Sequence, residues 1–258
     1  MSGRLSRTHY GRRVDLTSTP TAAFEKLFNF RDVGGVPGLD GRPVRRQRLY
    51  RSDSPHRIDG ADREAFGALG IRTVIDLRRP SEVQEHGRVP TYDGLVYQHI
   101  HPEHALWEES AYSEELGMAR YLADRYRDLA TTGAAGLVAA IEVIADAEAA
   151  PVLVHCVAGK DRTGVVCALT LSLLGVADSD IAEDYARSTA ASARFSEWLA
   201  STMPEAAPLP APFLGSPAEA MTLFLGELRD RHGSVPDYLI GAGLAPERID
   251  ALRGHLLS

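Results

Sequence analysis

The stretch from residue 151 to residue 164, PVLVHCVAGKDRTG, constrains the fold of this chain more than any other. It begins as an apolar strand, turns through small and charged residues, and resumes as an apolar helix. A chain that leaves a buried strand and enters a helix turns successive backbone N–H groups inward, where they and the positive end of the helix favour an anion. The stretch therefore predicts a phosphate site, with Cys156 at its base.

Cys156 and Arg162 are the predicted chemical centre of this loop. A helix N-terminus and nearby cations favour the thiolate form of a cysteine, so we expect Cys156 to act as a nucleophile. Arg162 follows after five intervening residues, and its planar fork suits a bidentate grip on two phosphoryl oxygens. The alternative, a buried structural cysteine at the end of a strand, predicts apolar neighbours instead of Gly-Lys-Asp-Arg-Thr-Gly.

The other loop residues are expected to shape the site and contact the phosphate. Lys160 would add positive charge at the rim, and Thr163 could donate a hydroxyl hydrogen bond to the sulfur of Cys156. The two glycines permit the turn. The predicted phosphate contacts are Val157, Ala158, Gly159, Lys160, Thr163 and Gly164.

A departing oxygen needs a proton, and two carboxylates are candidates for the general acid. Asp161 lies inside the loop, one residue before Arg162, where it could reach the leaving oxygen from the rim. Asp76 could approach from a neighbouring strand. We favour Asp161 because the loop fixes its distance from the phosphate; the alternative role for Asp161 is a hydrogen bond that shapes the loop.

Residues 71–78, IRTVIDLR, are β-branched and mostly apolar, as expected of a strand buried on both faces. We expect this strand to neighbour residues 151–155. Ligands in open α/β sheets bind at the carboxyl ends of the strands, so Asp76 and Arg78 would face the crevice of Cys156 and contact the substrate. The alternative is a buried ion pair beneath the site, and the sequence leaves both interpretations open.

Composition limits the class of protein and its partners. A chain of 258 residues with 44% hydrophobic residues is sufficient for one large α/β domain. The net charge of −7 argues against a general nucleic-acid binder. No stretch reaches the ~20 apolar residues of a transmembrane helix, and no apolar segment follows the basic N-terminus as in a signal peptide. We therefore expect a cytoplasmic protein, or one secreted without a conventional signal peptide.

The cysteines and histidines give no sign of a disulfide framework or a metal site. Cys156 and Cys167 are the two cysteines, and their spacing matches neither a redox pair nor a zinc cluster. Cys167 lies in an apolar run and is interpreted as a core residue, with a protective disulfide to Cys156 as the alternative. His99, His101 and His104 lack a firm ligand spacing, so no metal or cofactor is predicted.

The order of elements predicts an α/β fold with a mainly parallel central sheet flanked by helices, and with the phosphate loop between a central strand and a helix N-terminus. Residues 1–21 are expected to be a flexible tail and residues 22–258 a single domain. The proline-rich residues 204–217 predict a connector. Helices are expected over residues 59–69, 113–131, 133–149, 163–174, 178–203 and most of 218–257, with the last part packed on a face of the sheet.

The pattern His155-Cys156, five residues, Arg162-Thr163-Gly164 resembles the signature of the cysteine-dependent protein tyrosine phosphatase superfamily. The Gly-Lys-Asp-Arg core is similar to that of its bacterial tyrosine and phosphoinositide phosphatases. Residues 27–35, LFNFRDVGG, residues 50–53, YRSD, and the Asp-Leu-Arg at 76–78 with Glu82 following look like the same family. Relatives of this kind carry a helical lid, so the resemblance implies that residues 204–217 belong to a cover over the site.

This resemblance implies a metal-independent phosphomonoester hydrolase that works through a phosphocysteine intermediate and releases inorganic phosphate. Protein phosphotyrosine is the implied substrate, and a phosphoinositide or dual-specificity phosphatase is the alternative. A hypothesis of another class is a module that binds phosphorylated ligands without turnover. The intact set of Cys156, Asp161 and Arg162 weighs against that module.

Overall fold

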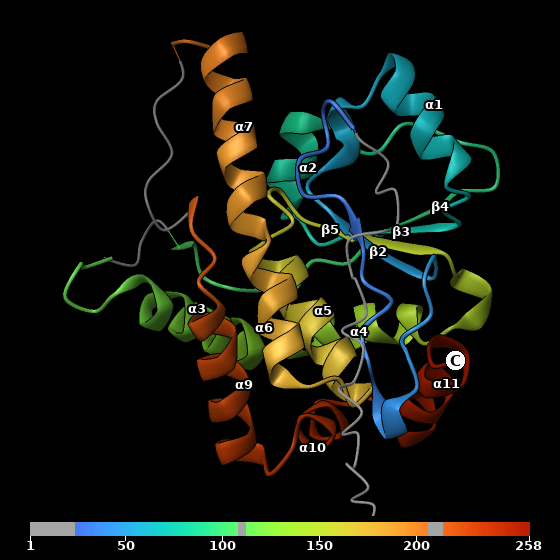
Figure 1. Cartoon of the computed structure of the whole chain (residues 1–258), viewed down its shortest axis with the longest axis vertical. Helices are drawn as coiled ribbons and strands as arrows, with labels where there is room; N and C mark the ends of the chain where they lie inside the picture. Colours follow the sequence, from blue (N-terminus) through green and yellow to red (C-terminus); the bar gives the residue numbers. More distant parts are fainter. Residues whose placement is uncertain (1–23, 108–111, 206–213) are drawn as a thin grey trace, which may run out of the picture.

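The computed structural model describes residues 24–107, 112–205 and 214–258 (Figure 1). The predicted tail at residues 1–21 lies outside these ranges, as do residues 206–213 of the predicted connector or lid. Within the described residues, the centre of the fold is a five-stranded sheet with the order β1-β2-β5-β3-β4. Its strands are β1 (Arg31–Asp32), β2 (Leu49–Ser52), β3 (Thr73–Asp76), β4 (Val96–His99) and β5 (Val152–His155).

The sheet is mainly parallel, which confirms the predicted fold class. Only β1 runs antiparallel, against β2 at one edge of the described sheet. The central strand β5 pairs in parallel with β2 on one side and with β3 on the other, and β4 extends the sheet beyond β3. The pairing places Asp76 beside His155, so the expected neighbourhood of these two strands is correct.

Alternate side chains of the central strands enter two separate hydrophobic cores, as the two-residue period of a strand requires. Leu153 and Val74 face the cluster that includes Phe66 of α1 (Gly60–Ala68). Val154 and Ile75 face the larger cluster, which the other helices supply. Both faces of the sheet are therefore covered, and Figure 1 shows α1 on one side with α4 and α5 on the other.

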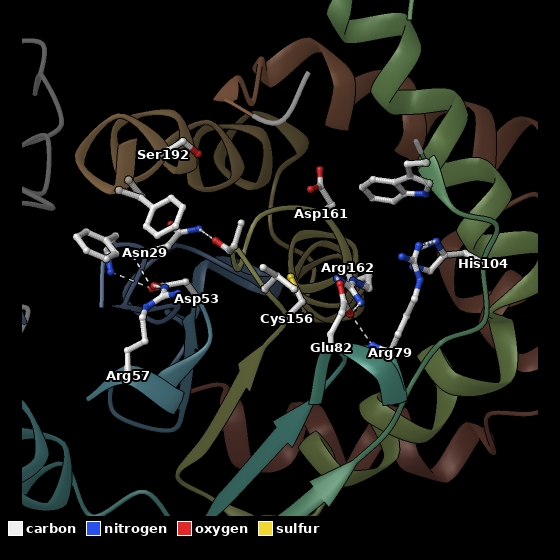
Figure 2. Close-up of a pocket in the computed structure, with 16 residues that line it drawn as sticks. Asn29, Asp53, Arg57, Arg79, Glu82, His104, Cys156, Asp161, Arg162 and Ser192 are labelled. Carbon is white, nitrogen blue, oxygen red and sulfur yellow. Dashed lines mark hydrogen bonds and ion pairs between the residues drawn. The ribbon is translucent and has the colours of Figure 1, made fainter. Parts of the chain in front are cut away.

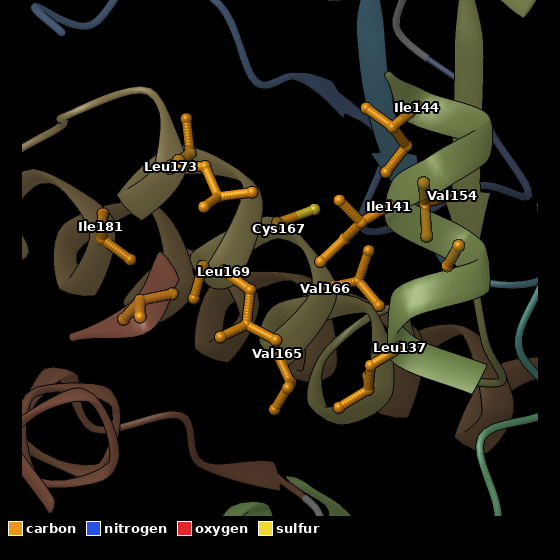
Figure 3. Packing of buried hydrophobic residues seen from close by; sticks show 14 of the residues in the cluster. Leu137, Ile141, Ile144, Val154, Val165, Val166, Cys167, Leu169, Leu173 and Ile181 are labelled. Carbon is orange, nitrogen blue, oxygen red and sulfur yellow. The ribbon is translucent and has the colours of Figure 1, made fainter. Parts of the chain in front are cut away.

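The larger core is built around α4 (Ala134–Ile144) and α5 (Asp161–Leu173). Figure 3 shows Leu137 and Ile141 of α4 against Val166 of α5, with Val154 of the central strand beside them. Nearly all of α5 is buried, as its apolar sequence predicts. The helix that follows the phosphate loop is thereby fixed in the middle of the protein.

The remaining helices agree with the expected ranges to within a few residues, except at one position. The short helix α2 (Pro80–His86), directly after β3, was not predicted. The others are α3 (Met118–Thr132), α6 (Asp178–Ala186), α7 (Ser188–Thr202), α9 (Ala218–His232), α10 (Val235–Gly241) and α11 (Pro246–Leu256), with short 3₁₀ turns at Leu39–Gly41, Pro55–Arg57 and Ala147–Ala149. No helix within the described ranges is long and apolar enough to cross a membrane.

The expectation that the C-terminal helices pack on the sheet is wrong for α9 and α10. Helix α9 packs on α3 and α6, and α10 packs on α9 and α5. The hydroxyl of Tyr238 in α10 donates to the carbonyl oxygen of Ala130 in α3 at 2.7 Å. Because α4 and α5 already cover this face of the sheet, α9 and α10 lie farther from it (Figure 1).

Candidate active site

A pocket of about 230 Å³ opens at the carboxyl ends of the parallel strands (Figure 2). Its lining comes largely from segments that directly follow these strands, as expected for an open α/β sheet. Asp53 and Arg57 follow β2, Arg79 and Glu82 follow β3, His104 and Trp107 follow β4, and Cys156, Val157, Ala158, Asp161 and Arg162 follow β5. Phe28, Asn29 and three residues of α7 (Ala191, Ser192 and Phe195) complete it.

Cys156 lies directly after the central strand and lines this pocket. The loop after it turns tightly at Gly159, whose φ is +63°. A Cβ atom on Gly159 would lie 2.1 Å from the carbonyl oxygen of Ser52, so the β2 end leaves room only for glycine there. The loop then enters α5 at Asp161, which places Cys156 near the positive end of a buried helix.

Arg162 is held in a two-point ion pair by Glu82 of the unpredicted helix α2. Its Nη1 and Nη2 donate to the two carboxylate oxygens at 2.6 and 3.0 Å, and Nη1 also donates to the carbonyl oxygen of Leu77 at 3.3 Å. Burial opposes the charge, but the hydrogen bonds that Arg162 donates to Glu82, together with nearby negative charge, outweigh burial and raise the pKa of Arg162. Among the described residues, Nε and the second hydrogen of Nη2 have no acceptor, and this edge of the guanidinium matches two phosphoryl oxygens.

Glu82 is itself fixed by the start of α2. Its Oε2 accepts a hydrogen bond from the backbone N–H of Arg79 at 2.6 Å. Burial alone would raise the pKa of Glu82, but the hydrogen bonds and charge of Arg162 lower it below its ordinary value. The carboxylate is therefore ionised, and its hydrogen bonds with Arg79 and Arg162 set the direction of the Arg162 guanidinium.

Asp161 lines the same pocket, and one of its carboxylate oxygens accepts a hydrogen bond from a buried tyrosine. The hydroxyl of Tyr126 donates to Oδ1 at 2.7 Å, and Tyr126 is hydrogen-bonded in turn to the hydroxyl of Tyr185. No hydrogen bond reaches Oδ2 from the described residues. The predicted general acid thus has one fixed oxygen and one that is available to a ligand.

Lys160 is not at the rim, and this expectation is corrected. Its side chain is 1% exposed and does not line the pocket. Its Nζ donates to the carbonyl oxygen of Gly215 at 3.0 Å and lies 3.5 Å from Oδ1 of Asp161. A buried ammonium needs acceptors, and Gly215, in the segment before α9, supplies one.

The expected hydrogen bond from Thr163 to the sulfur of Cys156 is not formed. The Thr163 hydroxyl is buried without a hydrogen-bond partner in the described structure. Helix α5 begins at Asp161, two residues earlier than expected, so Thr163 lies within its first turn. Gly164 is also buried, and it packs against the ring of Tyr185, which an added Cβ would meet at 3.1 Å.

Asp76 and Arg78 do not face the crevice, so their predicted contact with substrate is wrong, and the alternative of a buried ion pair is what the structure has. Both are fully buried and form an ion pair, in which Arg78 Nη2 donates to Asp76 Oδ2 at 2.6 Å and Nε donates to Oδ1 at 2.9 Å. Burial would raise the pKa of Asp76, but the hydrogen bonds from Arg78 outweigh it and lower the pKa to about 2. A carboxyl that is ionised and enclosed in this way is a poor proton donor, and the pair braces the strand end beneath the site.

Sequence comparisons relate this chain to known proteins. A sequence profile of the tyrosine phosphatase family matches residues 22–258. The chain belongs to the tyrosine phosphatase family. The triple specificity protein phosphatase PtpB of Mycobacterium tuberculosis is 32% identical to it, over 89% of this chain and 96% of that protein. A Cupriavidus necator protein named as a tyrosine-protein phosphatase is 30% identical, over 92% of this chain and 88% of its own.

The chain is therefore a phosphatase, and the resemblance inferred from its loop is confirmed. A tyrosine-protein phosphatase of Nostoc commune is 29% identical over 59% of this chain and 54% of its own. Because the family profile extends to residue 258, the matched region includes the helices after α5.

One side of the phosphatase pocket, formed by Asp53, Arg57 and Phe195, was not predicted from the sequence. Asp53 is buried and lies 3.5 Å from Arg57, whose guanidinium stacks over the rings of Phe195 and Trp198 at 5.1 and 5.6 Å. Burial raises the pKa of Asp53 to about 6, although backbone N–H groups and Arg57 oppose the shift. The YRSD sequence marked this segment, but its place in the pocket depends on the parallel pairing of β2 with β5.

The opposite side of the pocket contains His104 and Trp107, whose ring centroids are 5.2 Å apart. The Nδ1 of His104 lies 2.7 Å from the carbonyl oxygen of Ala105. Burial is the main cause that lowers the pKa of His104, to about 4, so this imidazole is neutral near pH 7. Aromatic side chains thus stand on both sides of the phosphatase loop.

Proposed function

We propose that this phosphatase hydrolyses phosphotyrosine on proteins through a phosphocysteine intermediate. The observation that carries the proposal is the meeting of Cys156, Asp161 and Arg162 in one pocket at the N-terminus of α5. A nucleophile, a proton donor and a bidentate anion ligand are the groups that two successive displacements at phosphorus require. No other set of this kind lines the pocket within the described residues.

The proposed reaction has two steps. In the first, the Cys156 thiolate attacks phosphorus, the bond to the leaving oxygen breaks, and Asp161 gives that oxygen its proton. In the second, water attacks the phosphocysteine, Asp161 accepts a proton from it, and the thiolate leaves with release of inorganic phosphate. The free edge of Arg162 and the loop N–H groups hold the equatorial oxygens throughout.

Phosphotyrosine is favoured as substrate because aromatic and apolar side chains contribute to the pocket wall on both sides of the loop. Phe28, Trp107, Val157 and Phe195 surround the site, and they suit an aryl group better than a hydrated inositol ring. The alternative is a phosphoinositide or dual-specificity phosphatase, and one relative is named a triple specificity protein phosphatase. A module that only binds phosphorylated ligands would gain nothing from Asp161, because a carboxylate beside a bound anion repels it.

Hydrolysis of p-nitrophenyl phosphate with and without EDTA tests the proposed function. We expect turnover that resists EDTA, because side chains supply both the nucleophile and the positive charge. Cys156→Ser should abolish turnover and retain phosphate binding, and Arg162→Lys should be severely impaired because an ammonium offers a point charge. The comparison of kcat/KM for a phosphotyrosine peptide and soluble phosphoinositides then decides the substrate order, and a large preference for the inositol phosphates would reverse it.

A further inference from the structure

The carbonyl groups of the phosphate loop accept hydrogen bonds from residues outside the loop. Asn29 Nδ2 donates to the carbonyl oxygen of Ala158 at 2.8 Å, and Arg51 Nη2 donates to that of Gly159 at 2.7 Å. The backbone N–H of Ser54 donates to the carbonyl oxygen of Val157 at 2.9 Å. Three successive carbonyls of the loop therefore point outward, each toward a donor.

The orientation of these carbonyls decides where the loop N–H groups point. In a planar trans peptide the C=O and the following N–H point in opposite directions. When Asn29 and Arg51 draw two carbonyls outward, the N–H groups of Gly159 and Lys160 are turned inward, toward the position of a bound phosphoryl group. A loop that lost these donors could rotate its peptide units, and a carbonyl oxygen would then face the anion.

The two donors belong to one buried network centred on Asp184 of α6. Arg51 Nη1 donates to Asp184 Oδ2 at 2.6 Å, and Arg31 Nε donates to Oδ1 at 2.7 Å. Arg31 Nη1 also donates to Oδ1 of Asn29, which fixes the amide so that its NH₂ group faces Ala158. Burial would raise the pKa of Asp184, but the charges of Arg31 and Arg51 outweigh it and hold the pKa well below its ordinary value.

We propose that Asn29 and Arg51 are positioning residues that set the phosphate loop for anion binding through the Asp184 network. The proposal rests on the proposed function of the loop as a phosphate site and extends it to two residues outside the loop: Asn29, which lines the pocket, and Arg51, which does not. It differs from a purely structural role because it concerns the direction of two peptide units. Such a role predicts a change in oxyanion affinity beyond any change in stability.

Asn29→Asp is the sharpest test, because the carboxylate keeps the shape of the amide and replaces its donor by an acceptor. The carboxylate would repel the Ala158 carbonyl and would still pair with Arg31. We expect the dissociation constant for inorganic phosphate, measured by calorimetry, to rise about 10- to 100-fold. The KM for p-nitrophenyl phosphate should rise by a similar factor.

Ser188→Ala is the matched control, because it perturbs the same network without touching the loop. The Ser188 hydroxyl oxygen accepts from Asn29 at 3.3 Å and from Arg31 at 3.4 Å. We expect this variant to bind phosphate like the unmodified protein. If Asn29→Asp fails to fold, Asn29→Ala and Arg51→Lys carry the same prediction, because the first removes the donor and the second cannot bridge Asp184 and Gly159.

Phosphate affinity equal to that of the unmodified protein in a folded Asn29→Asp variant would overturn the proposal, even if its melting temperature had fallen. An equal loss of affinity in Ser188→Ala would also overturn it, because the effect would then follow the network and not the carbonyls. Absence of aryl phosphatase activity in the unmodified protein is a separate result and would count against the proposed function instead.

Discussion

Glu82 accepts hydrogen bonds from both terminal nitrogens of Arg162, Nη1 at 2.6 Å and Nη2 at 3.0 Å. The arginine that is proposed to bind the phosphoryl group is therefore oriented by a helix that follows a different strand. A flexible arginine would lose side-chain entropy on binding phosphate. In this protein Glu82 already restricts the Arg162 side chain in the folded state, and the guanidinium edge that carries Nε is left for the ligand.

Glu82→Gln should therefore weaken catalysis although Glu82 makes no contact with the phosphorus. Loss of a charge-assisted, two-point hydrogen bond corresponds to a fall in kcat/KM of about 10- to 100-fold. The measurement is steady-state hydrolysis of p-nitrophenyl phosphate, with Glu85→Gln as the control on the exposed part of α2. Equal activity in the two variants would show that Arg162 is oriented without Glu82.

Asp161→Asn should slow phosphates with poor leaving groups more than p-nitrophenyl phosphate. A general acid contributes about 10²–10⁴-fold, and the contribution is largest when the leaving oxygen is strongly basic. The rates of alkyl and aryl phosphates, with the pH–rate profile of each, measure this, and the alkaline limb of the profile should flatten.

Asp76→Asn is the comparison for this test. Because Asp76 is paired with Arg78 in the interior, its replacement leaves a buried charge unpaired and should lower the stability by about 3–5 kcal/mol. The hydrolysis rates of the Asp76→Asn variant should depend on the leaving group as those of the unmodified protein do. If Asp76→Asn shows the leaving-group pattern and Asp161→Asn does not, the acid belongs to the strand.

Asp53 should make the stability depend on pH. Burial raises its pKa from 3.8 to about 6, so ionisation is harder in the folded state than in the unfolded state. The stabilisation that comes from the proton on Asp53 in the folded state is fully present below about pH 4 and is lost as the pH rises through 6. An asparagine side chain cannot ionise, so Asp53→Asn should gain about 3 kcal/mol relative to the unmodified protein between pH 4 and pH 7.

Chemical denaturation at a series of pH values measures this difference. Asp93→Asn, which changes an exposed carboxyl, is the control and should give a flat difference. A flat difference for Asp53→Asn as well would mean that Asp53 is not perturbed in the folded protein.

Lys160→Met should not change the choice between phosphotyrosine and phosphoinositides. Its ammonium is enclosed with Gly215 and Asp161 and cannot reach a head group, so both activities should fall by the same factor. The ratio of the two kcat/KM values reports this, with Lys26→Met, outside the pocket lining, as the control. A selective loss of phosphoinositide hydrolysis in Lys160→Met would place its side chain at the substrate.

The sequence was sufficient for those features that depend on neighbouring residues or on the parallel sheet. The strand, turn and helix around Cys156 are adjacent in the chain, and the pairing of β3 with β5 follows from two apolar strands. The Arg162 partner could not be predicted in the same way, because Glu82 is 80 residues distant and lies on a helix too short to show a periodic pattern.

The incorrect expectations concern the direction of side chains. A charged residue in a phosphate loop suggests contact with the ligand, but Lys160 turns toward Gly215, 55 residues later. Asp76 lies at the predicted end of its strand, yet Arg78, two residues on, takes both of its oxygens. Directions of this kind depend on where distant segments place acceptors, which no local pattern contains.

Trapping of a phosphoenzyme tests the central claim, that Cys156 carries the phosphoryl group. Asp161→Asn should slow the breakdown of the intermediate as well as its formation, so this variant is quenched during turnover of a radiolabelled phosphotyrosine peptide and then digested. We expect the label on the peptide that contains Cys156, its retention in a Cys167→Ala background, and its absence in Cys156→Ser. Label on another residue, or turnover that survives Cys156→Ser, would contradict the account.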